Sequence, residues 1–155
     1  MLEHDIKKAN ILGFSDGGNI ALKFILKYPD CVDKLIPNGA NLEPNGVKFR
    51  FQFPVEIAFR ITKIFSGISA RAKKRMELLG LMVNDPFIEI HELKNIAVPT
   101  LVIAGTNDMI HESHTKLIAN SIPNSKLVFI KGDHFIANKK PEEFNLAVNN
   151  FLQGK

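Results

Sequence analysis

The chain holds a serine, an aspartate and a histidine, which together can break an acyl bond. Ser15 lies within the sequence GFSDG, Asp108 within GTND and His134 within GDHF. A serine hydroxyl is a poor nucleophile at neutral pH. It therefore needs a base within hydrogen-bond reach and an acid that holds the base in its working tautomer. The sequence offers both partners, although they lie far from the serine along the chain.

The GFSDG sequence is typical of a nucleophile elbow, a sharp turn that joins a strand to a helix. The apolar run of residues 9–12 precedes it, and a helical pattern over residues 19–28 follows it. We expect Gly13 and Gly17 to be required, because a Cβ at either position would collide with neighbouring backbone. Such a turn holds the serine hydroxyl clear of the sheet. The alternative is a glycine-rich turn in which Ser15 only caps the helix.

The elements that must position these residues alternate between strand and helix, which predicts an α/β fold with a parallel sheet of about four strands flanked by helices. The expected strands are residues 10–14, 34–38, 98–104 and 127–130. The expected helices are residues 19–27 and 113–121, and one that begins at Pro141. The first helix is expected to share one apolar face among Ile20, Ala21, Phe24 and Ile25.

Asp108 and His134 each follow a predicted strand directly, as Ser15 does. Because the carboxyl ends of parallel strands meet at one edge of a sheet, we expect the three side chains to gather there. Asp133 is a competing candidate for the acid. It is the weaker one, because a carboxylate next in sequence to a histidine rarely reaches its ring.

The strand pattern disappears over residues 42–87, which we interpret as a helical cap insertion. Apolar residues recur there at helical spacing, at Ile57, Ile61, Ile64, Phe65 and Ile68. Gly67 and Gly80 are expected to divide the insertion into more than one helix. The insertion separates residues 1–41, which carry the elbow, from residues 88–155, which carry the aspartate and the histidine.

Most of the positive charge lies inside this insertion. The formal net charge is +4, and residues 48–75 alone hold eight basic side chains against the single acid Glu56. A charge run usually marks a solvated helical face. The alternative is attraction of anionic substrates or nucleic acid. The phenylalanines of this segment belong to no recognisable nucleic-acid-binding module, so we expect no nucleic-acid partner.

Length and composition are those of one compact domain of 155 residues with 45% hydrophobic content. No run approaches the ~20 apolar residues of a membrane span, and residues 1–5 lack the features of a signal peptide. A cytoplasmic location without a membrane partner is therefore expected. The single Cys31 excludes an internal disulfide, and His111 and His114 have no third ligand beside them. No metal and no cofactor is expected.

The motifs resemble those of the serine-dependent α/β-hydrolase superfamily, in its esterase, lipase and proline iminopeptidase-like branches. The superfamily shows the same chain order of serine, aspartate and histidine. The resemblance implies a partial α/β-hydrolase fold in which Ser15 is the nucleophile, His134 the general base and then acid, and Asp108 the orienting carboxylate. It also implies that the amide NH of Asp16 is one oxyanion donor.

The resemblance further implies that this chain corresponds to the carboxy-terminal part of such an enzyme, because the family has strands and an oxyanion loop before the elbow. Residues 10–14 would then form an edge strand, with apolar Leu12 and Phe14 and little charge to guard it. We expect a homodimer in which two copies join antiparallel along this strand. A separately encoded amino-terminal fragment that pairs with the same strand is the alternative.

The leading interpretation is a hydrolase of carboxylic ester-type bonds that forms an acyl-enzyme on Ser15 and takes a small-molecule substrate. The apolar insertion favours a hydrophobic acyl or aryl group, while its basic residues allow an anionic one. A truncated, catalytically impaired remnant that self-associates or binds a partner is the second interpretation. An acyltransferase or thioesterase with the same three residues is the third.

Overall fold

The computed structural model describes residues 6–154, so the expectation about a signal peptide, which rests on residues 1–5, lies outside the described residues. The strands are β1 (Ala9–Phe14), β2 (Val32–Asn38), β3 (Thr100–Gly105) and β4 (Ser125–Ile130). They form one four-stranded sheet in the order β1-β2-β3-β4, and every neighbouring pair is parallel. The expected parallel sheet is confirmed, and β1 lies at its edge.

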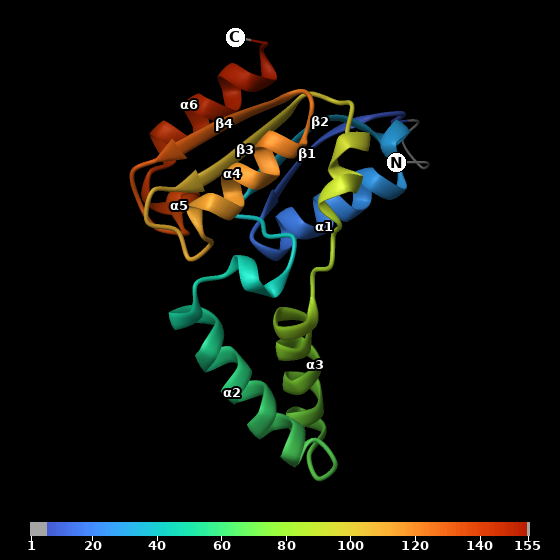
Figure 1. Cartoon of the computed structure of the whole chain (residues 1–155), viewed down its shortest axis with the longest axis vertical. Helices are drawn as coiled ribbons and strands as arrows, with labels where there is room; N and C mark the ends of the chain where they lie inside the picture. The colour runs from blue at the N-terminus through green and yellow to red at the C-terminus, as the bar shows by residue number, and fades with distance from the viewer. Residues whose placement is uncertain (1–5, 155) are drawn as a thin grey trace.

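The helices follow the expected alternation with strands (Figure 1). They are α1 (Asp16–Lys27), α2 (Phe49–Phe65), α3 (Ala70–Asn84), α4 (Glu112–Ser121), α5 (Ile136–Lys139) and α6 (Pro141–Leu152). Short 3-10 helices lie at η2 (Pro29–Cys31), η3 (Pro44–Gly46) and η4 (Ile90–Asn95). The four-residue helix α5 was not expected, because so short a segment shows no periodicity.

The sheet is buried between two layers of helices. On one face, α1, α4 and η4 enclose an apolar cluster that includes Leu22, Leu93 and Ile118. On the other face, α5 and α6 enclose a second cluster that includes Ile136 and Phe144. All six residues of β3 are buried. Burial on both faces explains why this strand reads as a continuous apolar run rather than as an alternating one.

Helix α1 buries a different set of residues from the one expected. Ile20 is 66% exposed, whereas Leu22 is fully buried beside Ala21 and Ile25. The helix also begins at Asp16, three residues before the expected start. The expected face was therefore wrong at Ile20. The polar Asn19 beside it is buried instead, because its side chain forms hydrogen bonds with Asn41.

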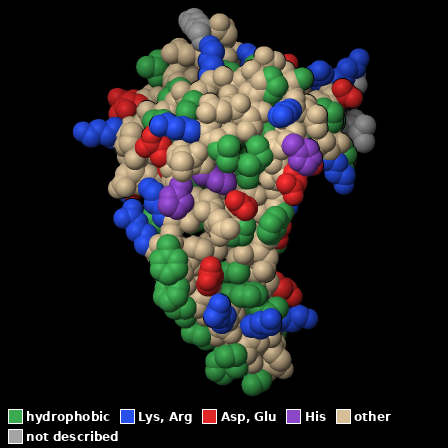
Figure 2. Space-filling model, viewed as in Figure 1, with side chains coloured by type: hydrophobic (Ala, Val, Ile, Leu, Met, Phe, Trp, Pro, Cys, Tyr) green, Lys and Arg blue, Asp and Glu red, His purple; other side chains and the backbone are tan. Residues whose placement is uncertain are grey.

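Helices α2 and α3 pack mainly on one another and form an arm, residues 49–84, that extends away from the sheet (Figure 1). Gly67 lies in the turn between them, whereas Gly80 lies within α3, so only the first glycine divides the helices. The helical spacing of residues 57–68 holds through α2. Nevertheless, large apolar side chains on the arm are exposed, and green side chains border its outer edge in Figure 2. Within residues 6–154, no helix is long and apolar enough to cross a bilayer.

Candidate active site

Ser15 occupies a strained turn between the end of β1 and the start of α1. Its φ of 54° and ψ of −122° lie outside the backbone regions that residues other than glycine prefer. The backbone NH of Ser15 donates to the carbonyl of Asn38 at the end of β2, with an N···O distance of 2.8 Å. Neighbouring strands therefore hold the turn in place, as expected where local strain accompanies function.

The glycines of the turn do not all serve the same purpose. A Cβ on Gly13 would lie 2.1 Å from the carbonyl oxygen of Gly17, so no side chain fits at position 13. A Cβ on Gly17 would meet nothing within 4 Å, and the expectation that this glycine is required was wrong. The tight position is instead Gly18, whose Cβ would lie 3.0 Å from Cβ of Ala40. Position 17 is thus open, whereas position 13 faces the backbone of α1.

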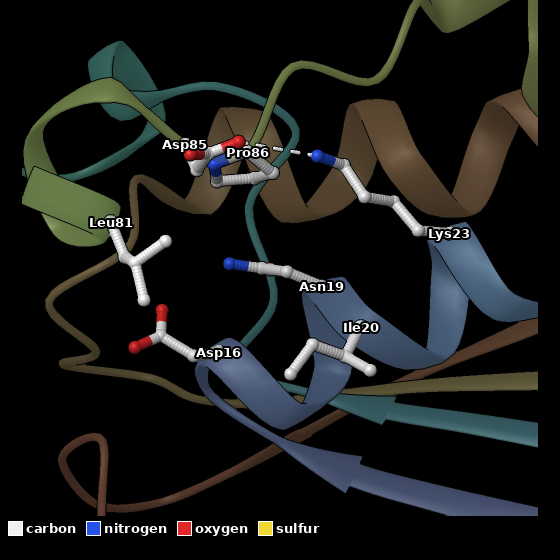
Figure 3. Close-up of a pocket in the computed structure, with 7 residues that line it drawn as sticks. All are labelled: Asp16, Asn19, Ile20, Lys23, Leu81, Asp85 and Pro86. Carbon is white, nitrogen blue, oxygen red and sulfur yellow. Dashed lines mark hydrogen bonds and ion pairs between the residues drawn. The ribbon is translucent and has the colours of Figure 1, made fainter. Parts of the chain in front are cut away.

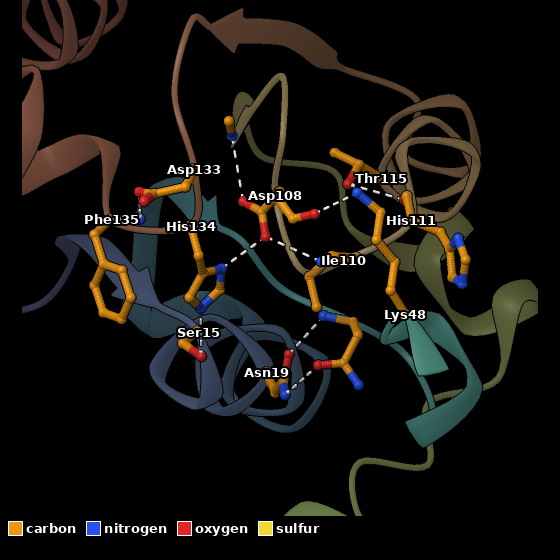
Figure 4. A network of polar contacts seen from close by, with 12 residues as sticks. Ser15, Asn19, Lys48, Asp108, Ile110, His111, Thr115, Asp133, His134 and Phe135 are labelled. Carbon is orange, nitrogen blue, oxygen red and sulfur yellow. Dashed lines mark hydrogen bonds and ion pairs between the residues drawn. The ribbon is translucent and has the colours of Figure 1, made fainter. Parts of the chain in front are cut away.

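The structure brings Ser15, Asp108 and His134 into contact (Figure 4). Nε2 of His134 lies 2.9 Å from Oγ of Ser15, and Nδ1 of the same ring lies 2.7 Å from Oδ1 of Asp108. The histidine is only 4% exposed and the aspartate 3%. Gly39 makes room for the ring, since a Cβ there would lie 2.7 Å from Cε1 of His134 and its φ is +62°.

Asp108 is stabilised as a carboxylate. Burial by itself raises the pKa of Asp108, but the hydrogen bond from His134 and those from the amides of Ile110 and Gly105 outweigh it, and the pKa falls below the ordinary aspartate value. The amide of Ile110 donates to Oδ1 at 3.0 Å, and that of Gly105 to Oδ2 at 3.2 Å. The carboxylate therefore stays charged beside the imidazole at neutral pH.

Asp133, the competing candidate, makes no contact of this kind with the ring. Its Oδ1 accepts from the amide of Phe135 at 2.9 Å, and its Oδ2 forms an ion pair with the side chain of Lys139. Both carboxylate oxygens are therefore engaged, one by the loop that follows β4 and the other by α5. This arrangement leaves Nδ1 of His134 to Asp108.

The backbone NH of Asp16 lies at the first position of α1. The first NH groups of a helix have no acceptor within the helix, and the helix dipole makes this end attractive to negative charge. The amide follows Ser15 directly. It can therefore donate to an oxygen that becomes negative when the serine attacks a carbonyl carbon.

Several residues around the site were not anticipated. The side chain of Lys48 donates to the backbone carbonyl of Asp108. Asn19 and Asn41 form a buried pair in which Nδ2 of Asn19 donates to Oδ1 of Asn41 at 3.0 Å, and the amide of Asn41 donates back to Oδ1 of Asn19 at 2.8 Å. The ring of Phe14 packs 4.8 Å from that of His134. These contacts span long stretches of sequence, so no local pattern indicates them.

A cavity of about 210 Å³ opens beside Asp16, between α1 and the end of α3 (Figure 3). Ile20, Leu81 and Pro86 give it an apolar lining. An ion pair between Nζ of Lys23 and Oδ1 of Asp85, at 3.3 Å, borders it. The cavity is large enough for a small apolar group.

Several known proteins that resemble this chain are hydrolases by name. A model of the serine hydrolase (FSH1) family matches residues 4–145. The chain is 29% identical to an abhydrolase domain-containing protein of Schizosaccharomyces pombe, over 98% of this chain and 70% of that protein. It is 26% identical to the serine hydrolase BPHL of Mus musculus, over 95% of this chain and 55% of that protein.

Among solved structures, a thermophilic esterase matches with a TM-score of 0.69 and 28% identity, over 99% of this chain and 69% of the esterase chain. This likeness agrees with the parallel sheet and its helical layers. The chain spans little more than half the length of the mouse protein.

Proposed function

The chain belongs to the serine hydrolase (FSH1) family, and from this membership we propose that it hydrolyses carboxylic ester-type bonds through an acyl-enzyme on Ser15. The observation that carries the proposal is the unbroken line of contacts from Asp108 through His134 to Ser15. A serine, an imidazole and a carboxylate in this order are the parts that acyl transfer by a serine nucleophile requires.

In the proposed first step, Oγ of Ser15 attacks the carbonyl carbon of the ester while its proton moves to Nε2 of His134. The imidazolium that forms is stabilised by the carboxylate of Asp108, which accepts the hydrogen bond from Nδ1. His134 then gives its proton to the alcohol oxygen as the carbon–oxygen bond breaks, which leaves the acyl group on Ser15.

In the second step, a water molecule attacks the acyl carbon and gives a proton to Nε2 of His134. The bond to Oγ of Ser15 breaks, and the proton returns to that oxygen, which releases the acid and restores the site. In both steps the carbonyl oxygen becomes negative, and the amide NH of Asp16 donates to it. One such donor typically lowers the barrier by about 2.7–4 kcal/mol.

For the substrate, we propose a small-molecule ester whose acyl or aryl part is apolar. The apolar lining by Ile20, Leu81 and Pro86 supports this class, and the volume of about 210 Å³ favours a short group. The borders of the cavity are polar at Asp16 and Lys23. The ester carbonyl would lie at the Asp16 border, next to the nucleophile.

A second candidate is a binding module whose catalysis is impaired. It is favoured by the edge of the sheet, where β1 pairs with β2 alone among the described strands and leaves Leu12 and Phe14 partly exposed. An edge strand without charged side chains can pair its free NH and CO groups with a strand of another chain. We propose that this edge binds a second copy in antiparallel orientation, with an amino-terminal fragment as the alternative occupant.

A fluorophosphonate probe separates the two candidates, because it labels only an activated serine. The wild-type chain and the control Ser113→Ala, which removes an exposed serine hydroxyl on α4, are expected to be labelled. Ser15→Ala and His134→Ala are expected to lose the label. Labelling that survives in Ser15→Ala would refute the nucleophile, whereas an unlabelled wild type would favour the binding module.

A further inference from the structure

One face of α2 carries a stripe of large apolar side chains that no described residue covers. The stripe comprises Phe49, Phe53, Ile57, Ile61 and Ile64. Steps of three and four residues keep these side chains on one side of a helix. Ile64 is 73% exposed, and Ile68, in the turn just beyond, is 84% exposed. The stripe therefore runs along the arm to its tip.

The stripe is distinct from the face of α2 that packs against α3. Gln52 is the buried residue of α2, and its side chain donates to the carbonyl of Met82 on α3. Phe59 lies against Gly80 of α3, since a Cβ on that glycine would meet its ring at 3.2 Å. The packing of α2 against α3 thus does not use the stripe, which remains available to another surface.

Basic side chains accompany the stripe. Arg60 and Lys63 flank it on α2, and the first turns of α3 add four more that are all exposed: Arg71, Lys73, Lys74 and Arg75. The arm, residues 49–84, holds seven basic residues against two acids, Glu56, which is half-buried, and Glu77, which is exposed. Figure 2 shows apolar and basic side chains beside one another on the lower part of the arm. The arm thus combines exposed apolar area with concentrated positive charge.

We propose that the arm, residues 49–84, docks on the surface of an anionic phospholipid bilayer. An amphipathic helix with aromatic and aliphatic residues on one side and Lys and Arg beside them lies in the interface, with its apolar side at the boundary between headgroups and acyl chains. The basic residues would bind the negative headgroups, whose potential attracts such clusters. This binding needs no spanning helix. The proposal departs from the sequence-based expectation of no membrane partner, which stays a prediction that the experiment below tests.

Charge favours a bilayer over a second copy as the occupant of the stripe. Two arms that packed stripe against stripe would bring two surfaces of net positive charge together, and like charges oppose that contact. An anionic surface instead neutralises that charge while it covers the apolar side chains. The proposal concerns binding alone and does not depend on the hydrolase activity.

Vesicle flotation tests the proposal. The full chain is mixed with vesicles of phosphatidylcholine and phosphatidylglycerol in equal parts, or of phosphatidylcholine alone, at low and at high salt. We expect the chain to float with the anionic vesicles, and high salt to weaken this binding. Substitution of both Ile61 and Ile64 by Ser should abolish flotation. Substitution of both Lys73 and Lys74 by Gln should weaken it roughly tenfold or more.

Two controls change the same residue types elsewhere on the surface. Leu146→Ser removes a 63% exposed leucine from α6, and Lys94→Gln removes an exposed lysine from η4. Both should float as the wild type does. Circular dichroism should find all variants folded, because each altered side chain is exposed.

Three outcomes of the flotation experiment would overturn the proposal. They are equal flotation with both kinds of vesicle, no flotation with either, and flotation of the Ile61/Ile64 variant at the wild-type level. A dimer that this variant converts to a monomer would assign the stripe to a second copy and would also overturn it. Binding to duplex DNA in preference to the anionic vesicles would assign the basic cluster to nucleic acid instead.

Discussion

His134 contacts Asp108 through Nδ1 at 2.7 Å, and hardly any of either side chain is exposed. The carboxylate also accepts hydrogen bonds from the amides of Gly105 and Ile110, which fix its orientation beside the ring. The imidazole is consequently held with Nε2 toward Ser15 before any substrate arrives. If the site is catalytic, its polar groups need no reorganisation during the reaction, and such preorganisation accounts for much of the rate enhancement of many enzymes.

Asp108→Asn should reduce ester hydrolysis by about 10⁴-fold, because an amide cannot stabilise the imidazolium and can select the wrong tautomer of His134. Steady-state hydrolysis of a p-nitrophenyl ester measures the effect. Asp133→Asn is the matched control, since Asp133 contacts Phe135 and Lys139 rather than the ring. An equal loss of activity in the two variants would contradict the assignment of the acid.

Gly13→Ala and Gly17→Ala should differ in stability although both change a glycine of the same motif. The new methyl at position 13 would collide with the carbonyl of Gly17, so we expect a loss of about 1–3 kcal/mol or more in the free energy of unfolding. The methyl at position 17 meets open space within α1, and alanine should stabilise the helix by about 0.5–1 kcal/mol. Urea unfolding of both variants tests this difference, and equal destabilisation would refute it.

The stability of the fold should fall on mild acidification because of His114. Burial, together with the nearby His111, lowers the pKa of His114 and outweighs Glu43, which raises it. Nε2 of His114 accepts the amide of Leu42 at 2.9 Å, which only an unprotonated nitrogen can do. The unfolded chain therefore takes up the proton first, and the free energy of unfolding decreases as pH falls below the ordinary histidine value of about 6.5.

Urea unfolding between pH about 8 and about 5 measures this dependence. The variant His114→Gln keeps an acceptor for Leu42 but does not titrate, so its stability should change less over the same range. His91→Gln, on an exposed ring, should behave as the wild type does. If His114→Gln shows the same slope as the wild type, another group is responsible.

The sequence was most informative where one physical constraint acts over a few residues. The buried run of β3 and the turn at Ser15 carry local signals, and strands that are parallel must bring their carboxyl ends together. Helical spacing, in contrast, locates a helix without saying which of its faces another element will cover. Ile20 of α1 and Ile64 of α2 each belong to an apolar pattern, but both are exposed because no other described element covers the part of the helix surface on which they lie. The contact of Lys48 with Asp108 joins the segment before the arm to the loop after β3, where the amide of Lys48 also donates to the carbonyl of Met109, and it has no local signal.

The edge of the sheet provides the last prediction. Leu12 lies in β1, which pairs with β2 on one side only among the described strands, and its side chain is partly exposed. If two copies join along β1, Leu12→Lys should convert a dimer to a monomer, because a charge on an edge strand opposes pairing. Size-exclusion chromatography with light scattering measures the mass, and Leu146→Lys, on exposed α6 surface, should leave the dimer intact. A wild type that is monomeric at micromolar concentration would rule out this pairing and leave the edge to an amino-terminal fragment.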